Sequence, residues 1–111
     1  MAYGYYSEVY FAIDYDDNKK IKIGETTNAR RRDRQLDVWI TKVVEVGGDK
    51  CYRLLIESLL REKISRMPRV QQIGNDYFYC ETQEIALSIQ NHFTEWVDFF
   101  QKNIEKLLTN N

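Results

Sequence analysis

The sequence contains few of the residues on which specialised small domains rely. Among its 111 residues are one proline, two cysteines and one histidine. Cys51 and Cys80 form no CxxC pair, and His92 has no partners at the spacing of zinc ligands, so a zinc site is not expected. One disulfide between the cysteines stays open as an alternative, but reduced thiols in the core are the simpler expectation.

Long apolar runs and an excess of one charge are absent as well. No stretch stays apolar over the roughly 20 residues that a membrane-spanning helix needs, and no signal peptide is recognisable. Sixteen basic and seventeen acidic residues leave a formal net charge of −1. We therefore expect a soluble, intracellular (cytoplasmic) protein without a membrane contact, in which any contact with nucleic acid comes from a local patch.

The residues that are present predict one α+β domain spanning 1–111. A hydrophobic fraction of 43% and an aromatic fraction of 14% are typical of a globular chain. The pattern of apolar residues predicts the following elements: strands at 8–14, 20–24, 41–46 and 77–80, and helices at about 29–40, 49–67 and 82–108. Pro68 ends the second of these helices. The core is expected at about 8–80, followed by the long C-terminal helix.

The helix predicted at about 29–40 begins with an unusual cluster of arginines. Three candidate N-caps precede it: Thr26, Thr27 and Asn28. Its first turns carry four arginines: Arg30, Arg31, Arg32 and Arg34. Positive charge at a helix N-terminus is unfavourable because the helix dipole is positive there, yet the unpaired N–H groups of this end bind phosphate well. A cluster that costs stability at a place suited to anions indicates a function.

Four short features of the chain resemble the GIY-YIG nuclease superfamily. They are Val9-Tyr10-Phe11, Lys22-Ile23-Gly24 with Lys22 twelve positions after Tyr10, then Arg32, and finally Glu57. The second motif, with the threonines and arginines after it, is similar to a subgroup common in phages and fungi. Residues 74–78 look like a loose version of the Gly-Glu-Trp-Phe motif of that subgroup. The resemblance covers roughly residues 8 to 80 and implies a small three-stranded antiparallel sheet flanked by helices.

The resemblance also implies a set of catalytic residues for phosphodiester hydrolysis. Tyr10 would act as general base or orient the water, helped by positive charge from Lys22 and Arg32, since an unperturbed tyrosine has a pKa of about 10. Arg32 would hold the phosphate oxygens by forked hydrogen bonds. Glu57 would bind one Mg²⁺ or Mn²⁺, which would stabilise the leaving oxygen. We expect Glu57 to point to the same face as the other three.

Contacts with neighbouring phosphates are expected from residues around the arginine cluster. Gly24 would allow close approach of a phosphate to the backbone, because it has no side chain. The predicted nucleic-acid-binding residues are Gly24, Thr26, Arg30, Arg31 and Arg34. Such contacts supply affinity without reading the base sequence.

Departures from the family pattern keep other functions open. Lys22 stands where most of the superfamily has its second signature tyrosine. Glu57 also has a simpler possible role than metal binding, namely an exposed ion pair with Arg53 or Arg61. The first hypothesis is a metal-dependent DNA endonuclease or nickase from a phage, a mobile element or a host defence system. The second is a catalytically degenerate module that only binds nucleic acid or a protein. The third is a homodimer or adaptor formed through the C-terminal helix, where Val97 and Phe99 fall off the main apolar stripe.

Overall fold

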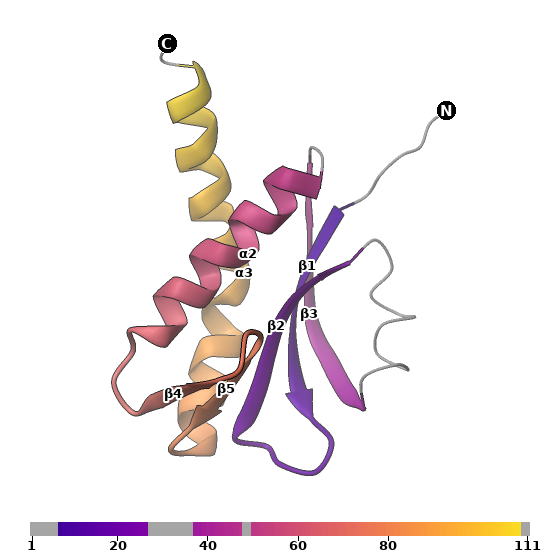
Figure 1. Ribbon diagram of the computed structural model, residues 1–111, viewed down its shortest axis with the longest axis vertical. Coiled ribbons are helices and arrows are strands. Elements are labelled where there is room, and N and C mark those ends of the chain that lie inside the picture. Colours follow the sequence, from indigo (N-terminus) through magenta and orange to yellow (C-terminus); the bar gives the residue numbers. More distant parts are fainter. Residues whose placement is uncertain (1–6, 27–36, 48–49, 110–111) are drawn as a thin grey trace.

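The computed structural model describes residues 7–26, 37–47 and 50–109, which form a five-stranded antiparallel sheet and two helices (Figure 1). The strands follow the order β3-β1-β2-β5-β4 across the sheet. Their bounds are Ser7–Asp14 for β1, Lys20–Thr26 for β2, Val38–Val46 for β3, Val70–Ile73 for β4 and Tyr77–Cys80 for β5. Helix α2 spans Lys50–Ser65 and helix α3 spans Gln83–Thr109. The α+β class and the long C-terminal helix are therefore confirmed.

The hairpin of β1 and β2 forms the middle of the sheet. Alternating branched and aromatic residues favour these two strands, and their register pairs Tyr10 with Gly24 and Ala12 with Lys22. The turn between them is closed by aspartate side chains, since Asp14 Oδ2 accepts from the Asp16 N–H and Asp17 Oδ1 from the Lys19 N–H, each at 3.0 Å. Such aspartates stabilise turns because the side chain replaces a backbone acceptor.

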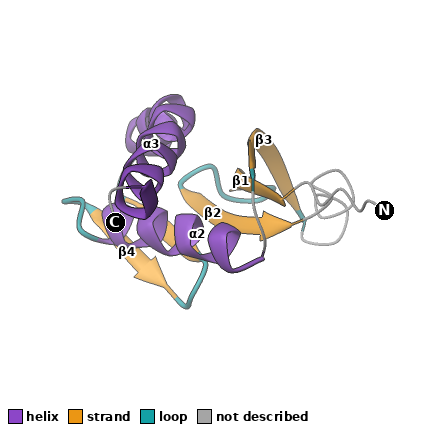
Figure 2. Ribbon diagram, turned by 90° about the horizontal axis from the view of Figure 1, so that it is seen from above, coloured by secondary structure: helices purple, strands orange, loops and turns teal. Residues whose placement is uncertain are grey.

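The two faces of the sheet differ in what covers them. Val9, Phe11, Ile21 and Ile23 pack with buried residues of both helices in one large core. The intervening residues point the other way, as strand geometry requires, and Tyr10, Ala12 and Val38 form a second cluster with Ile40 and Tyr77. Figure 2 shows the helices and the sheet from above. We call these the helix face and the opposite face.

The sheet contains five strands, whereas the sequence pattern predicted four and the family resemblance implied three. Strand β5 joins β2, and β4 joins β5 through a turn that contains Gly74 at φ +72°. Strand β3 begins at Val38, so the predicted helix at 29–40 is wrong over its last three residues. These residues are β-branched or aromatic, and they pair with Asp14, Ile13 and Ala12 of β1. Residues 29–36 of that helix lie outside the described part of the chain.

The apolar stripes predicted for the two helices are mostly buried, although Leu55 of α2 is 45% exposed. Val97, which was expected to fall off the stripe of the C-terminal helix, is fully buried in the main core. The expectation that Val97 contributes to a partner surface is therefore wrong, while Phe99 is 60% exposed. No helix in the described ranges is long and apolar enough to cross a membrane.

Candidate functional site

Tyr10 and Gly24 lie side by side on the opposite face of the sheet. Tyr10 is only 1% exposed, and Gly24 is its direct partner across the β1–β2 ladder. A Cβ atom at Gly24 would lie 2.4 Å from both Cζ and Oη of the Tyr10 ring. The missing side chain therefore makes room for the Tyr10 ring. Gly24 was predicted to admit a phosphate, but in this structure the tyrosine fills the space.

Lys22 is buried next to two aromatic rings on the same face. Its Nζ lies 5.8 Å from the centre of the Tyr10 ring and 5.2 Å from that of Tyr77. A cation at such a distance is attracted to the negative face of the ring. Its partner is Asp76, whose Oδ2 lies 3.2 Å from Nζ. Burial raises the pKa of Tyr77 above its usual value, and nearby aspartates raise it further.

Asp76 bridges the two faces of the sheet. Strand β5 pairs with β2 only as far as Lys22, and at this point the backbone carbonyl of Asp76 accepts the Ile23 N–H at 3.0 Å. Its carboxylate binds Lys22 from the opposite face through Oδ2 and Arg61 from helix α2 through Oδ1, the latter at 3.1 Å. One carboxylate thus joins cations that come from different layers of the fold.

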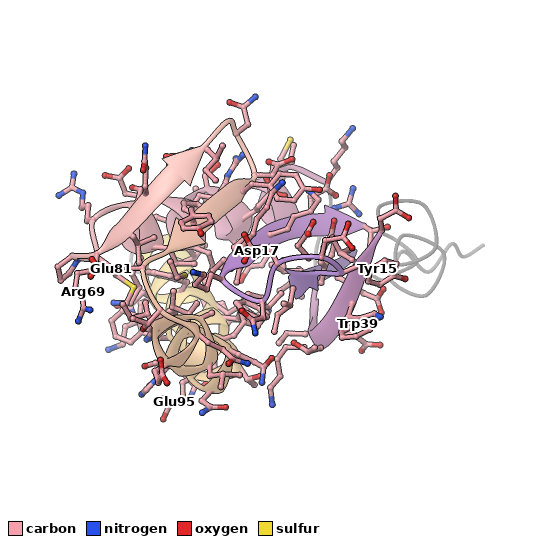
Figure 3. The ribbon with its side chains drawn as sticks, turned by 90° about the horizontal axis from the view of Figure 1, so that it is seen from below. Tyr15, Asp17, Trp39, Arg69, Glu81 and Glu95 are labelled. Carbon is pink, nitrogen blue, oxygen red and sulfur yellow. The ribbon has the colours of Figure 1, made fainter. Side chains whose placement is uncertain are left out.

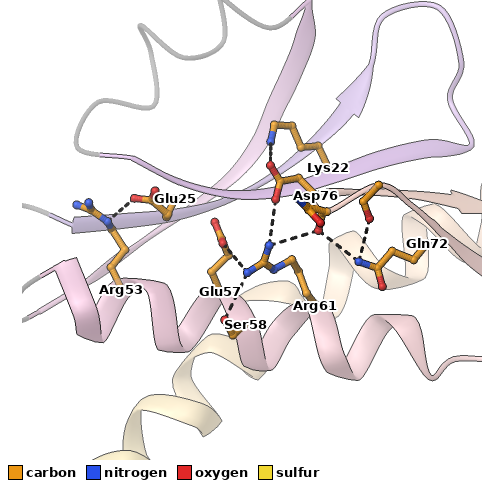
Figure 4. A network of polar contacts seen from close by, with 10 residues as sticks. Lys22, Glu25, Arg53, Glu57, Ser58, Arg61, Gln72 and Asp76 are labelled. Atoms are coloured by element: carbon orange, nitrogen blue, oxygen red, sulfur yellow. Dashed lines mark hydrogen bonds and ion pairs between the residues drawn. The ribbon is translucent and has the colours of Figure 1, made fainter.

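Glu57 lies on α2, inside the same charged cluster (Figure 4). It is 6% exposed, and its Oε1 lies 3.0 Å from Nη2 of Arg61. One turn earlier on the helix, Arg53 pairs with Glu25 of β2. Burial raises the pKa of Glu57 above its ordinary value, because the charged form loses hydration. Arg61 and Lys22 lower this pKa, whereas Asp76 and Glu25 raise it.

The structure brings together only some of the predicted site residues. Tyr10, Lys22 and Gly24 lie together, but Glu57 belongs to a helix on the helix face, so the expectation of one shared face is wrong. Three ion pairs connect Glu57 to Lys22 at the edge of β2: Glu57 pairs with Arg61, Arg61 pairs with Asp76, and Asp76 pairs with Lys22. Thr26 is the last residue of β2, and the helix start that it was expected to cap lies outside the described residues. Four predicted phosphate-binding residues lie outside the described residues: Arg30, Arg31, Arg32 and Arg34.

The fit of a divalent metal depends on Glu57. Within the described ranges, no group of three or more histidine, cysteine or acidic side chains is arranged to hold a metal ion. Mg²⁺ is nevertheless often held by one or two carboxylates, with water and substrate phosphate completing its octahedron. A buried carboxylate at the edge of a charged cluster fits this kind of site. It does not fit a cage made by the protein alone.

Asp76 and Glu25 are functional candidates that reasoning from the sequence missed. Asp76 stands 54 positions from Lys22, and neither residue indicates the contact by itself. Glu25 follows the Lys22-Ile23-Gly24 motif directly, and strand alternation from Ile21 and Ile23 would have placed it towards the helices. The i,i+4 spacing of Glu57 and Arg61 did predict their ion pair, but this pair is largely buried rather than exposed.

Other features of the surface lie apart from this cluster. A cavity of about 320 Å³ is lined by Arg69, Val70, Gln71, Tyr79 and Glu81. Figure 3 shows Arg69 and Glu81 at one end of the molecule, and Tyr15 with Trp39 at the other.

The cysteines are not bonded to each other, as expected. Cys80 is buried, which raises the pKa of its thiol to about 11, whereas Cys51 is exposed rather than in the core.

Known proteins add no further constraint on this site. Comparison of the chain with models of protein families, with curated proteins and with solved structures finds no match in any of the three.

Proposed function

We propose that this protein is a metal-dependent nuclease of the GIY-YIG type, which nicks or cuts DNA by hydrolysing a phosphodiester bond. The observation that carries the proposal is the chain of ion pairs from Lys22 through Asp76 and Arg61 to Glu57. It links the strand residues of the family pattern with the one carboxylate that the pattern assigns to the metal. A nuclease needs these groups close together, since its transition state carries extra negative charge.

Each residue has a definite role in the proposed reaction. Tyr10, in its phenolate form, accepts a proton from the attacking water, and the ammonium of Lys22 beside its ring stabilises the negative charge that the phenolate oxygen carries before the transfer. Arg32 holds the non-bridging oxygens of the phosphate, because a guanidinium matches two oxygens at once. Arg30, Arg31 and Arg34 contact neighbouring phosphates and position the DNA.

Glu57 is the residue that would hold the Mg²⁺ or Mn²⁺ ion. When bound, the metal supplies positive charge for the leaving oxygen. The protein contributes a carboxylate that burial has already deprived of most of its water. Such a carboxylate has much to gain from a cation, because its charge is poorly solvated.

The test is nicking of supercoiled plasmid in Mg²⁺ or Mn²⁺. Glu57→Gln and Arg32→Ala are each expected to lower the rate by about 100-fold or more, the effect typical of removing one group that stabilises the transition state. Glu62→Gln is the matched control, since Glu62 lies exposed on the same helix and pairs only with Arg66 among the described residues. Unchanged cleavage by Glu57→Gln and Arg32→Ala would overturn the mechanism.

A non-catalytic module that binds nucleic acid is the second candidate. It is favoured by the burial of Lys22 and Glu57, both of which already have a counter-ion within the fold. This alternative predicts no cleavage by any variant, together with salt-sensitive DNA binding that Arg30→Ala or Arg31→Ala weakens. A protein that binds no DNA and sediments as a dimer would instead point to an adaptor that uses α3 and the exposed Phe99.

A further inference from the structure

The turn between β4 and β5 holds the Asp76 backbone in place independently of its carboxylate. The Asp76 carbonyl is bonded to the Ile23 N–H at 3.0 Å. The Gln72 Nε2 atom donates to the carbonyls of Gly74 at 3.0 Å and Asn75 at 3.4 Å. Because these bonds involve only the backbones of Ile23 and of residues 74–76 and the Gln72 side chain, they do not need the Asp76 charge. The role of that charge must lie in what the carboxylate contacts.

The carboxylate of Asp76 fixes the ammonium of Lys22. Lys22 is 6% exposed, and Asp76 is its one ion-pair partner among the described residues. A buried ammonium without a partner is unfavourable, so the flexible lysine side chain would turn towards water if the carboxylate were absent. Nζ would then leave its position 5.8 Å from the Tyr10 ring centre.

The same carboxylate also divides the guanidinium of Arg61 between two acids. Nη1 of Arg61 lies 3.1 Å from Asp76, while Nη2 lies 3.0 Å from Glu57. When both terminal nitrogens of an arginine are available, its guanidinium can bind one carboxylate through two parallel hydrogen bonds. Nη1 also donates to the Asn75 carbonyl at 3.3 Å, but Asp76 is the charged partner of this nitrogen. Without the Asp76 charge, Glu57 is the remaining ionic partner of Arg61 among the described residues, so Arg61 can turn towards both oxygens of Glu57 and compete there with an external cation.

We propose that Asp76 is a positioning residue of this site, which holds Lys22 beside Tyr10 and prevents Arg61 from closing on Glu57. The inference rests on the proposed function, because it assigns Asp76 to the same nuclease site. Asp76 acts through Lys22 and Arg61, the two side chains that its carboxylate contacts.

The test uses the full chain with Asp76→Asn, which keeps the size and the backbone bonds of the turn but removes the charge. Asp98→Asn is the matched control, since Asp98 forms an exposed ion pair with Lys102 on α3, in another part of the fold. Acetylation of each lysine is followed by mass spectrometry, and Mn²⁺ binding by electron paramagnetic resonance. Asp76→Asn is expected to raise the acetylation rate of Lys22 and to weaken Mn²⁺ binding, the latter by about 10-fold or more. Asp98→Asn is expected to change neither.

Activity supplies a further readout. The nicking rate of Asp76→Asn at saturating DNA is expected to be lower than that of the wild type, while its affinity for DNA is unchanged. Asp76→Glu is expected to restore part of the nicking rate, because glutamate carries the same charge as aspartate. A purely structural role would lower the melting temperature but leave Lys22 acetylation and Mn²⁺ affinity of the folded protein unchanged, and this result would overturn the inference. If the wild type neither nicks DNA nor binds Mn²⁺, the proposed function fails. Lys22 acetylation in Asp76→Asn then decides alone whether Asp76 positions the lysine.

Discussion

At the scale of single residues, the contact between Tyr10 and Gly24 explains why the second motif ends in glycine. A methyl group at Gly24 would overlap the Tyr10 ring, whose Cζ and Oη lie 2.4 Å from the Cβ position. The ring is 1% exposed and has little room to move. We expect Gly24→Ala to lower the free energy of unfolding by about 1–3 kcal/mol, the usual cost of overpacking a core. Urea unfolding measures this difference.

Gly47→Ala is the control for this substitution, because a Cβ atom at Gly47 meets nothing within 4 Å. Its unfolding free energy is expected to stay within about 0.5 kcal/mol of the wild type, as for most surface changes. Equal stability of the two variants would show that the tyrosine ring does not occupy the space above Gly24.

At the scale of elements, helix α2 places a charged residue at every turn beside the edge of β2: Arg53, Glu57 and Arg61. Burial raises the pKa of Glu57 above 4.5, so the folded chain binds this proton more tightly than the unfolded chain does. Between 4.5 and the raised pKa, the contribution of Glu57 to the unfolding free energy therefore falls as the pH rises. Glu57→Gln is expected to remove this part of the pH dependence in urea unfolding.

Glu62→Gln on the exposed side of α2 serves as the reference, since it leaves Glu57 intact. A wild-type protein whose pH profile matches that of Glu57→Gln between pH 4 and 7 would contradict the assignment. The same property should govern metal binding, because only the ionised carboxylate is a ligand. Mn²⁺ affinity is therefore expected to fall on acidification at a higher pH than for an ordinary glutamate.

The sequence predicts those features of the structure that depend on neighbouring residues, and it does not predict those that depend on residues far apart in the chain. The residue pattern in β1 and β2 is a local signal, and it predicted the hairpin, whereas the closeness of Tyr10 and Lys22 was implied by the family resemblance. Strand β4 was missed because Val70–Ile73 is short and half glutamine, so only its pairing with β5 makes it a strand. Asp76 was missed for a similar reason, since its two cations come from elements distant in the sequence. Such contacts are tertiary and have no local pattern.

At the scale of the whole molecule, the net charge of −1 gives no general attraction for DNA. Binding must then come from a few positive side chains, and the arginines at 30–34 are the proposed ones. We expect Arg30→Ala and Arg31→Ala each to reduce the slope of log affinity against log salt concentration by about 1. Fluorescence anisotropy with a labelled duplex measures this slope. An unchanged slope in both variants would place the phosphate contacts elsewhere.

The strand order of the sheet has a consequence for the time at which the site forms. The hairpin of β1 and β2 is complete within the first 26 residues, but β5 pairs with β2 only after the chain has continued to residue 80. Lys22 and Asp76 are 54 positions apart, and closing so long a loop is slower than forming the hairpin. A chain still being synthesised therefore carries Tyr10 and Lys22 long before Asp76 reaches Lys22. If the proposed nuclease function holds, a nascent chain would be able to bind DNA through its basic segment before β5 has paired, but it would cut DNA only afterwards.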